Sequence, residues 1–366
     1  MALADEHRFG ASAPLTLGVE EELLLVDPAL DLRAAAEETI ERLDPEWRER
    51  VSTELFATQI ELKTGICADA GTAAVELEAA REAVRAAGAT LLGAGLHPTY
   101  AGSSELVDKP RYAVVKQDLA GLIDEPPSGL HVHVGMPDAE TAIAVANALR
   151  YHLPVLAALC ANSPFRGGRD SGMASARAAV VRAYPRFEMP PELESYAEFL
   201  RVADQLALAA GVDDYTYLWW DVRPHPRLGT VEVRAMDVQP EVRTNAAVAA
   251  LVQALAAREI ERPSAGGLAR EALEESYFQA GRHGLEARVL TPDGAPVAAR
   301  ELARRVLDEA APFAPGGDGA LAPLEAILSA GNGAERQRAV HAEAGMDGLL
   351  RALVERTGSA SVSPGG

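Results

Sequence analysis

The sequence has little of what several classes of protein require. It has only two cysteines, Cys67 and Cys160, among 366 residues, which excludes a disulfide framework and a zinc ribbon. No apolar run reaches the roughly 18 residues of a membrane-spanning helix, and the N-terminus lacks the apolar segment of a signal peptide. Basic residues number 34 against 54 acidic ones, and a net charge of −20 argues against a nucleic-acid-binding surface. We therefore expect a cytoplasmic protein that binds neither nucleic acid nor membrane.

The short motifs of common enzyme classes are missing as well. There is no P-loop, no GxGxxG after a strand, no HExxH and no GxSxG. Hydrophobic residues nevertheless make up 48% of the chain, which is typical of a folded globular protein.

Hydrophobic periodicity predicts strands followed by helices. We expect strands over residues 15–27, 51–64 and 128–138, a hairpin over 215–240, and helices over 70–91, from about 139 with a boundary at Pro154, and over 190–211. The pattern predicts one α+β domain over 1–366, with an antiparallel sheet backed by helices. Its sheet motifs span about 15–240, a mostly helical part spans about 241–356, and a frayed tail spans 357–366.

Three adjacent acids stand inside the first predicted strand, TLGVEEELLLVDP (16–28). Because successive strand side chains point to opposite faces, Glu20 and Glu22 share one face. Glu21 shares the other face with Val19 and Leu23. We expect Glu21 either to pair with an Arg or to lie near a sheet edge.

The same alternation occurs on three other predicted strands. One face carries His131 and His133, Glu232 and Arg234, or Asp221 and Arg223, while the opposite face is apolar. A solvated sheet with cross-strand ion pairs would explain any one of these strands. Repeated over four strands, the choice of Glu, His, Asp and Arg favours a functional site.

Converging carboxylates need a counter-charge. Two like charges about 4 Å apart cost roughly 4 kcal/mol at an effective dielectric of about 20. Magnesium prefers carboxylate oxygens together with substrate phosphates, so a metal site would explain Glu20 and Glu22. Glu54 and Glu61 have an odd separation, so either a bulge intervenes or Glu54 belongs to a turn before the strand.

Two further segments are candidates for binding. Arg166 and Arg169 lie in a Gly-rich loop and Arg177 follows it; they would suit an anionic substrate, or the segment is a plain loop. We interpret Trp219 and Trp220 as packing residues rather than an adenine shelf.

In combination, these segments resemble the type 2 glutamate–cysteine ligase family, and more narrowly the YbdK-type carboxylate–amine ligases of bacteria. The similarity is carried by GVEEELLLVDP, GLHVHVGMPD, ANSPFRGGRDSGMASAR and WWDVRPHPRLGTVEVRAMDVQP. These segments occur in order between about Leu15 and about Gln253, and a weaker similarity continues through AGRHGLEARVLTPDG and GAERQRAV.

The resemblance implies a curved antiparallel sheet like that of glutamine synthetase and glutamate–cysteine ligase. It also implies that ATP joins the side-chain carboxyl of L-glutamate to the amine of L-cysteine, as in glutathione-type thiol biosynthesis, with ADP and phosphate as products. Two or three magnesium ions would bind at residues that match the family's motifs: Glu20, Glu22, Glu54, Glu61, His131 and Glu232. The first of the paired acids is Glu54 where distant relatives have Asp.

Phosphoryl transfer needs charge neutralisation and alignment. Arg234 would donate to the transferred phosphoryl group, because its planar fork matches phosphate oxygens. Arg223 would grip a carboxylate or phosphate, or else form a salt bridge with Asp221 or another neighbour. His133 has no counterpart in the family pattern. Because it shares a strand face with His131, we expect it to contact substrate or nucleotide.

Two other interpretations stay open. One is a zinc metallohydrolase, because His131 and His133 form a His-x-His pair that can chelate zinc. The other is a relative of the ligases with a different amine acceptor or with no activity. A homodimer is expected from the family alone.

Overall fold

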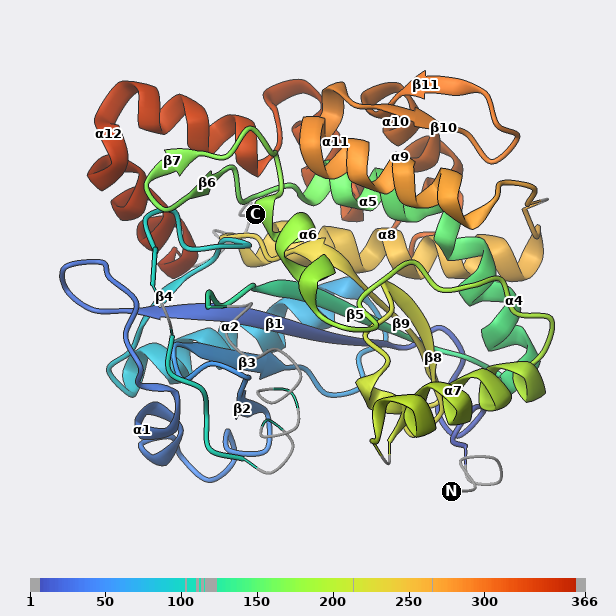
Figure 1. Ribbon diagram of the computed structural model, residues 1–366, viewed down its shortest axis with the longest axis horizontal. Coiled ribbons are helices and arrows are strands. Elements are labelled where there is room, and N and C mark those ends of the chain that lie inside the picture. The colour runs from blue at the N-terminus through green and yellow to red at the C-terminus, as the bar shows by residue number, and fades with distance from the viewer. Residues whose placement is uncertain are drawn as a thin grey trace.

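The structure, a computed structural model, describes residues 7–359 except 103, 110–111, 113–114, 116–123, 213 and 265. In this part of the chain seven strands form one sheet, and every neighbouring pair is antiparallel. The order is β2-β3-β1-β5-β9-β8, with β4 beside β1 (Figure 1). The strands are β1 (Leu17–Val26), β2 (Val51–Thr53), β3 (Gln59–Lys63), β4 (Thr90–Leu92), β5 (Gly129–Gly135), β8 (Val222–His225) and β9 (Thr230–Asp237). The predicted antiparallel sheet is confirmed.

The prediction of one strand over residues 51–64 is wrong. Residues 51–64 form two strands, β2 and β3, joined by a turn that contains Glu54. This settles the odd spacing of Glu54 and Glu61, because Glu54 belongs to the turn before β3. The predicted hairpin is confirmed by the pairing of β8 with β9.

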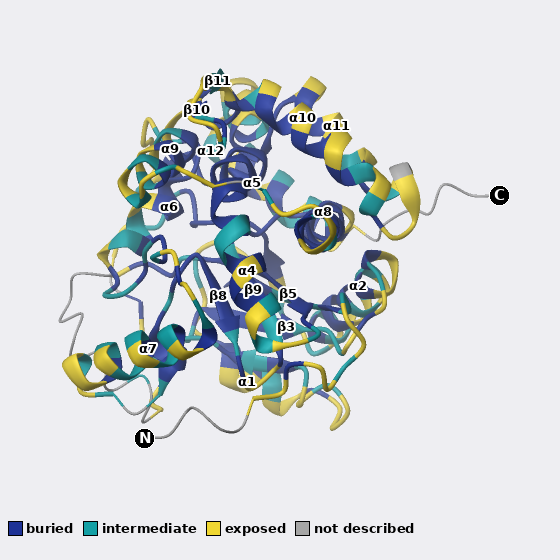
Figure 2. Cartoon of the chain, turned by 90° about the vertical axis from the view of Figure 1, so that its right-hand side faces the viewer, coloured by how far each residue is buried: buried dark blue, intermediate teal, exposed yellow. Residues whose placement is uncertain are grey.

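The apolar face of the sheet packs against helices. Val19, Val132 and Val233 are buried in one hydrophobic cluster with residues of α4 (Ala139–Leu149), α5 (Leu153–Cys160) and α8 (Val242–Glu261). Helix α8 contacts β1 and β5 on one side and the outer helices α10 and α11 on the other. It is accordingly dark blue over most of its surface in Figure 2. The sheet therefore has one face available for polar chemistry.

The predicted helix boundary at Pro154 is confirmed. Helix α4 ends at Leu149, a 3-10 turn follows, and Pro154 lies in the first turn of α5. The combined segment Ala139–Cys160 is long and apolar enough to cross a membrane by length and composition, contrary to the sequence expectation. Of its most apolar window, 89% is buried inside the protein, which is typical of a core helix.

The remaining helices and short hairpins surround this core. They are α1 (Ala36–Glu41), α2 (Ala70–Ala86), β6 (Phe165–Arg166) with β7 (Arg169–Asp170), α6 (Ala176–Val180), α7 (Tyr196–Ala210), α9 (Arg270–His283), β10 (Arg288–Leu290) with β11 (Pro296–Ala298), α10 (Ala299–Ala310), α11 (Ala322–Ala330) and α12 (Gly333–Gly358). Most of residues 241–356 in the described chain are therefore helical.

The predicted tail begins too early. Helix α12 continues to Gly358, and the buried hydroxyl of Thr357 accepts a hydrogen bond of 2.9 Å from the backbone N–H of Gly93. Residues 360–366 lie outside the described part of the chain.

Candidate active site

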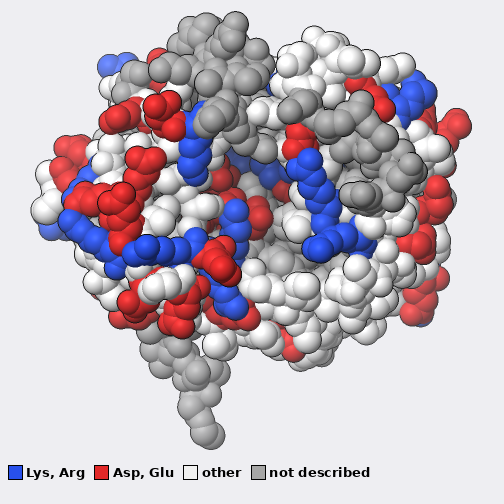
Figure 3. Space-filling model, turned by 90° about the horizontal axis from the view of Figure 1, so that it is seen from below, with Lys and Arg blue, Asp and Glu red and all other residues white. Residues whose placement is uncertain are grey.

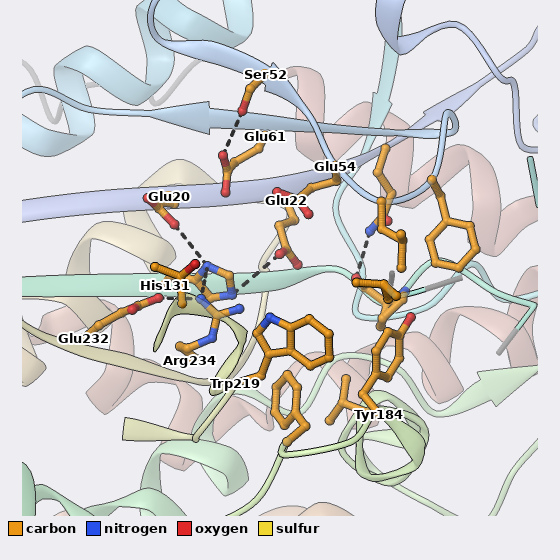
Figure 4. A pocket seen from close by; sticks show the side chains of 18 of the residues that line it. Glu20, Glu22, Ser52, Glu54, Glu61, His131, Tyr184, Trp219, Glu232 and Arg234 are labelled. Atoms are coloured by element: carbon orange, nitrogen blue, oxygen red, sulfur yellow. Dashed lines mark hydrogen bonds and ion pairs between the residues drawn. The ribbon is translucent and has the colours of Figure 1, made fainter. Parts of the chain in front are cut away.

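The polar face of the sheet forms the floor of a cavity of about 450 Å³. Seen from this side, the surface is hollowed, and acidic and basic side chains lie inside the hollow (Figure 3). Its ionisable lining residues are Glu20, Glu22, Glu54, Glu61, Lys63, Lys109, Tyr112, His131, His133, Arg177, Tyr184, Arg223, His225, Glu232 and Arg234. The structure therefore brings all six predicted metal ligands into one cavity (Figure 4).

The register of the sheet explains this convergence. Glu20 pairs with His131 across β1 and β5, and Glu22 pairs with Glu61 across β1 and β3. Glu232 on β9 lies opposite His133. Because directly paired residues share a face, four strands place their ionisable side chains side by side.

Three groups of potential ligand atoms result. They are Glu20 with His133 and Glu232, Glu20 with Glu61 and His131, and Glu22 with Glu54 and Glu61; within each group the atoms lie within 4.8 Å of one another. The donors are carboxylate oxygens and imidazole nitrogens, and the Nε2 atoms of His131 and His133 are buried with no hydrogen-bond partner among the described residues. This donor set fits divalent cations.

The electrostatics of the acids point the same way. Burial and the charges of Glu61 and Glu22 raise the pKa of Glu54 well above its usual value. Burial and the charge of Glu20 raise the pKa of Glu61. Burial alone would raise the pKa of Glu20 as well, but hydrogen bonds from His131 and His133 lower it well below its usual value. Lys63 forms an ion pair with Glu61, yet the pKa values of Glu54 and Glu61 stay raised, so this one lysine does not offset the burial and mutual repulsion of the carboxylates.

The two predicted catalytic arginines differ. Arg234 forms an ion pair with Glu232, its Nη1 lies 3.4 Å from His131 Nδ1, and its buried Nε has no partner among the described residues. Arg223 is held in place: its Nε donates to Glu232 at 2.7 Å and its Nη1 donates to two backbone carbonyls. Of the two, Arg234 retains more donor capacity toward the cavity.

Arg223 does not pair with Asp221. That buried carboxylate instead accepts hydrogen bonds of 2.7 and 3.0 Å from Arg182. Of the alternatives for Arg223, the structure shows the salt bridge with another neighbour, Glu232.

The three loop arginines separate in the structure. Arg166 pairs with Glu125 and lines two other pockets, and Arg169 lines one of these two. Arg177 lines the cavity and is 2% exposed, and its Nε and Nη1 have no hydrogen-bond partner in the described chain. Only Arg177 of this set is placed to bind an anion in the cavity, so the grouping of all three is not supported by their positions.

Several lining residues were not predicted. Lys63 follows Glu61 by two positions on β3, so the alternation rule would have found it on the same face. Trp219 and Tyr184 form an edge-on aromatic pair, with ring centroids 6.0 Å apart, at the apolar end of the cavity (Figure 4). The packing assignment is right for Trp220, which is buried in the core, but Trp219 lines the cavity.

Glu21 occupies the opposite face of β1, as its position predicts. It is fully buried and pairs with Arg81 of α2, whose Nε lies 2.8 Å from Glu21 Oε2. Asn245 of α8 donates to the other carboxylate oxygen at 2.6 Å. Glu21 therefore connects β1 to α2 and α8, while Glu20 and Glu22 line the cavity on the opposite face.

This antiparallel sheet, which brings carboxylates, imidazoles and arginines into one cavity, has the same fold as ligases of known structure. Solved structures share the fold. Glutamate–cysteine ligase from Francisella tularensis in complex with AMP matches with a TM-score of 0.70 at 12% identity, covering 95% of this chain and 90% of that one. A bifunctional glutathione synthetase from Pasteurella multocida matches with a TM-score of 0.67 at 12% identity, covering 94% of this chain and 52% of that one.

Sequence comparison gives the family. Residues 16–356 match glutamate–cysteine ligase family 2. The chain is 38% identical over 355 residues to glutamate–cysteine ligase from Haloferax volcanii, covering 92% of this chain and 96% of the relative. It is 41% identical over 362 residues to a protein of Rubrobacter xylanophilus provisionally named glutamate–cysteine ligase 2-3, covering 96% and 98%. The chain belongs to glutamate–cysteine ligase family 2, and it is an enzyme of the ligase class.

Proposed function

We propose that the protein joins the γ-carboxylate of L-glutamate to the amine of L-cysteine and converts ATP to ADP and phosphate. The observation that carries this proposal is the convergence of three ligand groups and Arg234 in one cavity. An acidic protein that handles ATP and glutamate needs local positive charge, and cations at these groups would supply it. The names of the relatives at 38% and 41% identity support the choice of substrates.

The residues of the chain have distinct tasks in this reaction. Glu20, Glu22, Glu54, Glu61, His131 and Glu232 would hold two or three magnesium ions, which would neutralise the phosphates of ATP when bound. Arg234 donates to the γ-phosphoryl group as it passes to the glutamate carboxylate. The resulting acyl phosphate is attacked by the amine, and phosphate leaves.

Arg177 and Arg223 assist in different ways. The Nε of Arg177 has no hydrogen-bond partner among the described residues and suits a substrate carboxylate or a phosphate, while its Nη1 lies 3.9 Å from Asp237 Oδ1. Arg223 acts through Glu232, whose carboxylate it holds at 2.7 Å, and is therefore a positioning residue.

The apolar end of the cavity receives a non-ionic group. Leu55, Val181, Tyr184, Phe187 and Trp219 line it. In the proposed reaction that group is either the adenine or the side chain of the acceptor. Trp219→Ala separates the two: lower affinity for Mg-ATP without amine assigns the adenine, whereas an altered choice of amine at unchanged Mg-ATP affinity assigns the acceptor.

The decisive experiment measures ADP release from the purified protein with Mg-ATP and L-glutamate, with L-cysteine and a panel of other amines. We expect release to depend on glutamate and on L-cysteine, and to be lost in Glu22→Gln. The exposed Glu38 of α1 provides the control Glu38→Gln, which should remain active. Absence of stimulation by any amine, together with absence of Mg-ATP binding in calorimetry, would overturn the proposal.

The zinc metallohydrolase is disfavoured by geometry. His131 and His133 belong to different groups of three ligand atoms within the described residues, so they do not converge on one ion. The proposal also includes a cytoplasmic location, small-molecule substrates only, and a homodimer that light scattering of the purified chain can test.

A further inference from the structure

We propose that the buried carboxylate of Asp237 is a positioning residue of the reaction, which holds Arg177 so that its guanidinium can bind a carboxylate or phosphate group of a substrate. This inference rests on the proposed function in taking Arg177 as a ligand-binding residue. It goes beyond that function, because Asp237 is not among the residues that line the cavity and acts through Arg177, which does line it.

Arg177 lies on a helix that cannot hold it in place alone. Helix α6 has five residues, and a helix this short is not stable without contacts outside it. Its start is fixed by Ser163 and Ser175, which form a β-bridge, and the backbone N–H of Ala176 donates to the carbonyl of Ser163 at 2.9 Å. The position of the Arg177 guanidinium therefore depends on what holds these two serines.

Asp237 holds both serines from the end of β9. It is 2% exposed, and the hydroxyls of Ser163 and Ser175 donate to its Oδ2 and Oδ1, each at 2.8 Å. The same hydroxyl oxygens accept from the backbone of α6: Ser163 Oγ from Arg177 N–H at 3.2 Å, and Ser175 Oγ from Ala178 N–H at 3.1 Å. One carboxylate therefore fixes the backbone at and beside Arg177 through two serine hydroxyls.

Asp237 also acts on the guanidinium directly. Arg177 Nη1 lies 3.9 Å from Asp237 Oδ1, which is too long for a hydrogen bond but close enough for charge attraction. Arg177 Nη2 donates to the backbone carbonyl of Arg234 at 3.4 Å. The buried Nε of Arg177 has no partner among the described residues. The guanidinium is thus drawn toward β9, and its Nε is left for an oxygen of a bound substrate.

This arrangement requires a carboxylate rather than an amide. Asp237 accepts from three donors, the two serine hydroxyls and the backbone N–H of Asn162 at 2.9 Å. The amide nitrogen of an asparagine would face one of these donors and would not attract Arg177. Burial raises the pKa of Asp237, although the charge of Arg177 and the three donors oppose this, so the ionised form is favoured by keeping Arg177 close.

Calorimetry of the full chain, with L-glutamate and with Mg-ATP separately, identifies the ligand of Arg177. We expect Arg177→Gln to weaken binding of one of the two and to leave the other unchanged. Asp237→Asn should weaken binding of the same ligand by roughly tenfold to a hundredfold, because a displacement of about 1 Å can cost that much. Ser175→Ala removes one of the two serine hydroxyls and should weaken it by a smaller factor.

A coupling test distinguishes positioning from a general loss of structure. The double variant Asp237→Asn, Arg177→Gln should bind that ligand no more weakly than Arg177→Gln alone. In the ADP-release assay, Asp237→Asn should raise KM for that ligand only, whereas partial unfolding would lower kcat at unchanged KM. Glu259→Gln is the matched control, because buried Glu259 also accepts from a serine hydroxyl, that of Ser264 at 2.8 Å, and should change neither KM.

The outcomes separate the two proposals. The positioning role is wrong, and the ligase function stands, if Asp237→Asn and Ser175→Ala bind both ligands as the unmodified protein does. It is also wrong if Arg177→Gln weakens neither ligand, or if the losses of Asp237→Asn and Arg177→Gln simply add. If the unmodified protein binds neither ligand, both proposals fail. Circular dichroism checks folding, and Ser175→Ala tests the role even where Asp237→Asn does not fold.

Discussion

The buried pair of Glu21 and Arg81 should make a large contribution to stability. The two residues are 0% and 1% exposed, and Arg81 also donates to the backbone carbonyls of Gln239, Pro240 and Thr357. Arg81→Met would leave the Glu21 carboxylate and these carbonyls without their donor. Breaking a buried ion pair by removing one partner costs about 3–5 kcal/mol of unfolding free energy.

Urea unfolding at pH 7, followed by circular dichroism and tryptophan fluorescence, measures this loss. At a slope of about 3 kcal/mol per molar urea, the midpoint of Arg81→Met should fall by roughly 1–1.7 M. The matched control is Arg85→Met on the same helix, whose pair with Glu82 at 2.7 Å lies at the surface and should change stability by less than about 1 kcal/mol.

A second variant tests the mechanism. Glu21→Leu combined with Arg81→Met removes both charges, so its loss should be smaller than the sum of the two single losses by about 2 kcal/mol or more. The reasoning is refuted if Arg81→Met unfolds at the same urea concentration as Arg85→Met, or if the single losses simply add.

Three further predictions concern the cavity, the acid response and a helix end. A Cβ at Gly129 would overlap the guanidinium of Arg177, so Gly129→Ala should weaken Mg-ATP or glutamate binding in calorimetry about tenfold or more, and unchanged binding of both would contradict this. Burial alone would raise the pKa of Glu259, but hydrogen bonds from His152 and Ser264 lower it to about 2. This group should therefore contribute about 3 kcal/mol of unfolding free energy at pH 5 that is lost as the pH falls to 2. Urea titrations at the two pH values should find this loss in the unmodified protein and not in Glu259→Gln. Asn332 caps α12 in a capping box, and Asn332→Ala should lower the unfolding free energy by about 1–2 kcal/mol in the same assay.

Much of the site could be predicted because strands obey a strict alternation. Alternation along each strand places Glu20, Glu22, His131 and Glu232 on the polar face of the sheet, and this placement is found in β1, β5 and β9. Antiparallel pairing then brings these residues together without any knowledge of the helices.

The remaining parts depend on contacts that no local pattern encodes. The partner of Glu21 is 60 residues away on α2. Helical periodicity places Arg81 on the buried face with Leu77 and Val84, but it does not say which acid Arg81 will meet there.

Arg166, Arg169 and Arg177 lie in or just after one Gly-rich segment, yet of these three only Arg177 lines the cavity. Tertiary packing sets the path of a loop, so the sequence of the segment does not predict this. Trp219 and Trp220 are adjacent, but one lines the cavity and the other is buried in the core; both precede β8, so strand alternation does not assign their sides.

The hydrogen bond from Arg81 to Thr357 has a consequence for synthesis of the chain. The two residues are 276 positions apart, and a ribosome adding about 5–20 residues per second needs roughly 14–55 s to make that stretch. Until then, a nascent β1–α2 unit can contain the Glu21–Arg81 pair, and the carbonyl groups of Gln239 and Pro240 can join it, but that of Thr357 cannot. The strand that carries Glu20 and Glu22 therefore reaches its final setting only near the end of translation, so slow codons or stalling before residue 357 should lower the yield of active enzyme more than the yield of polypeptide.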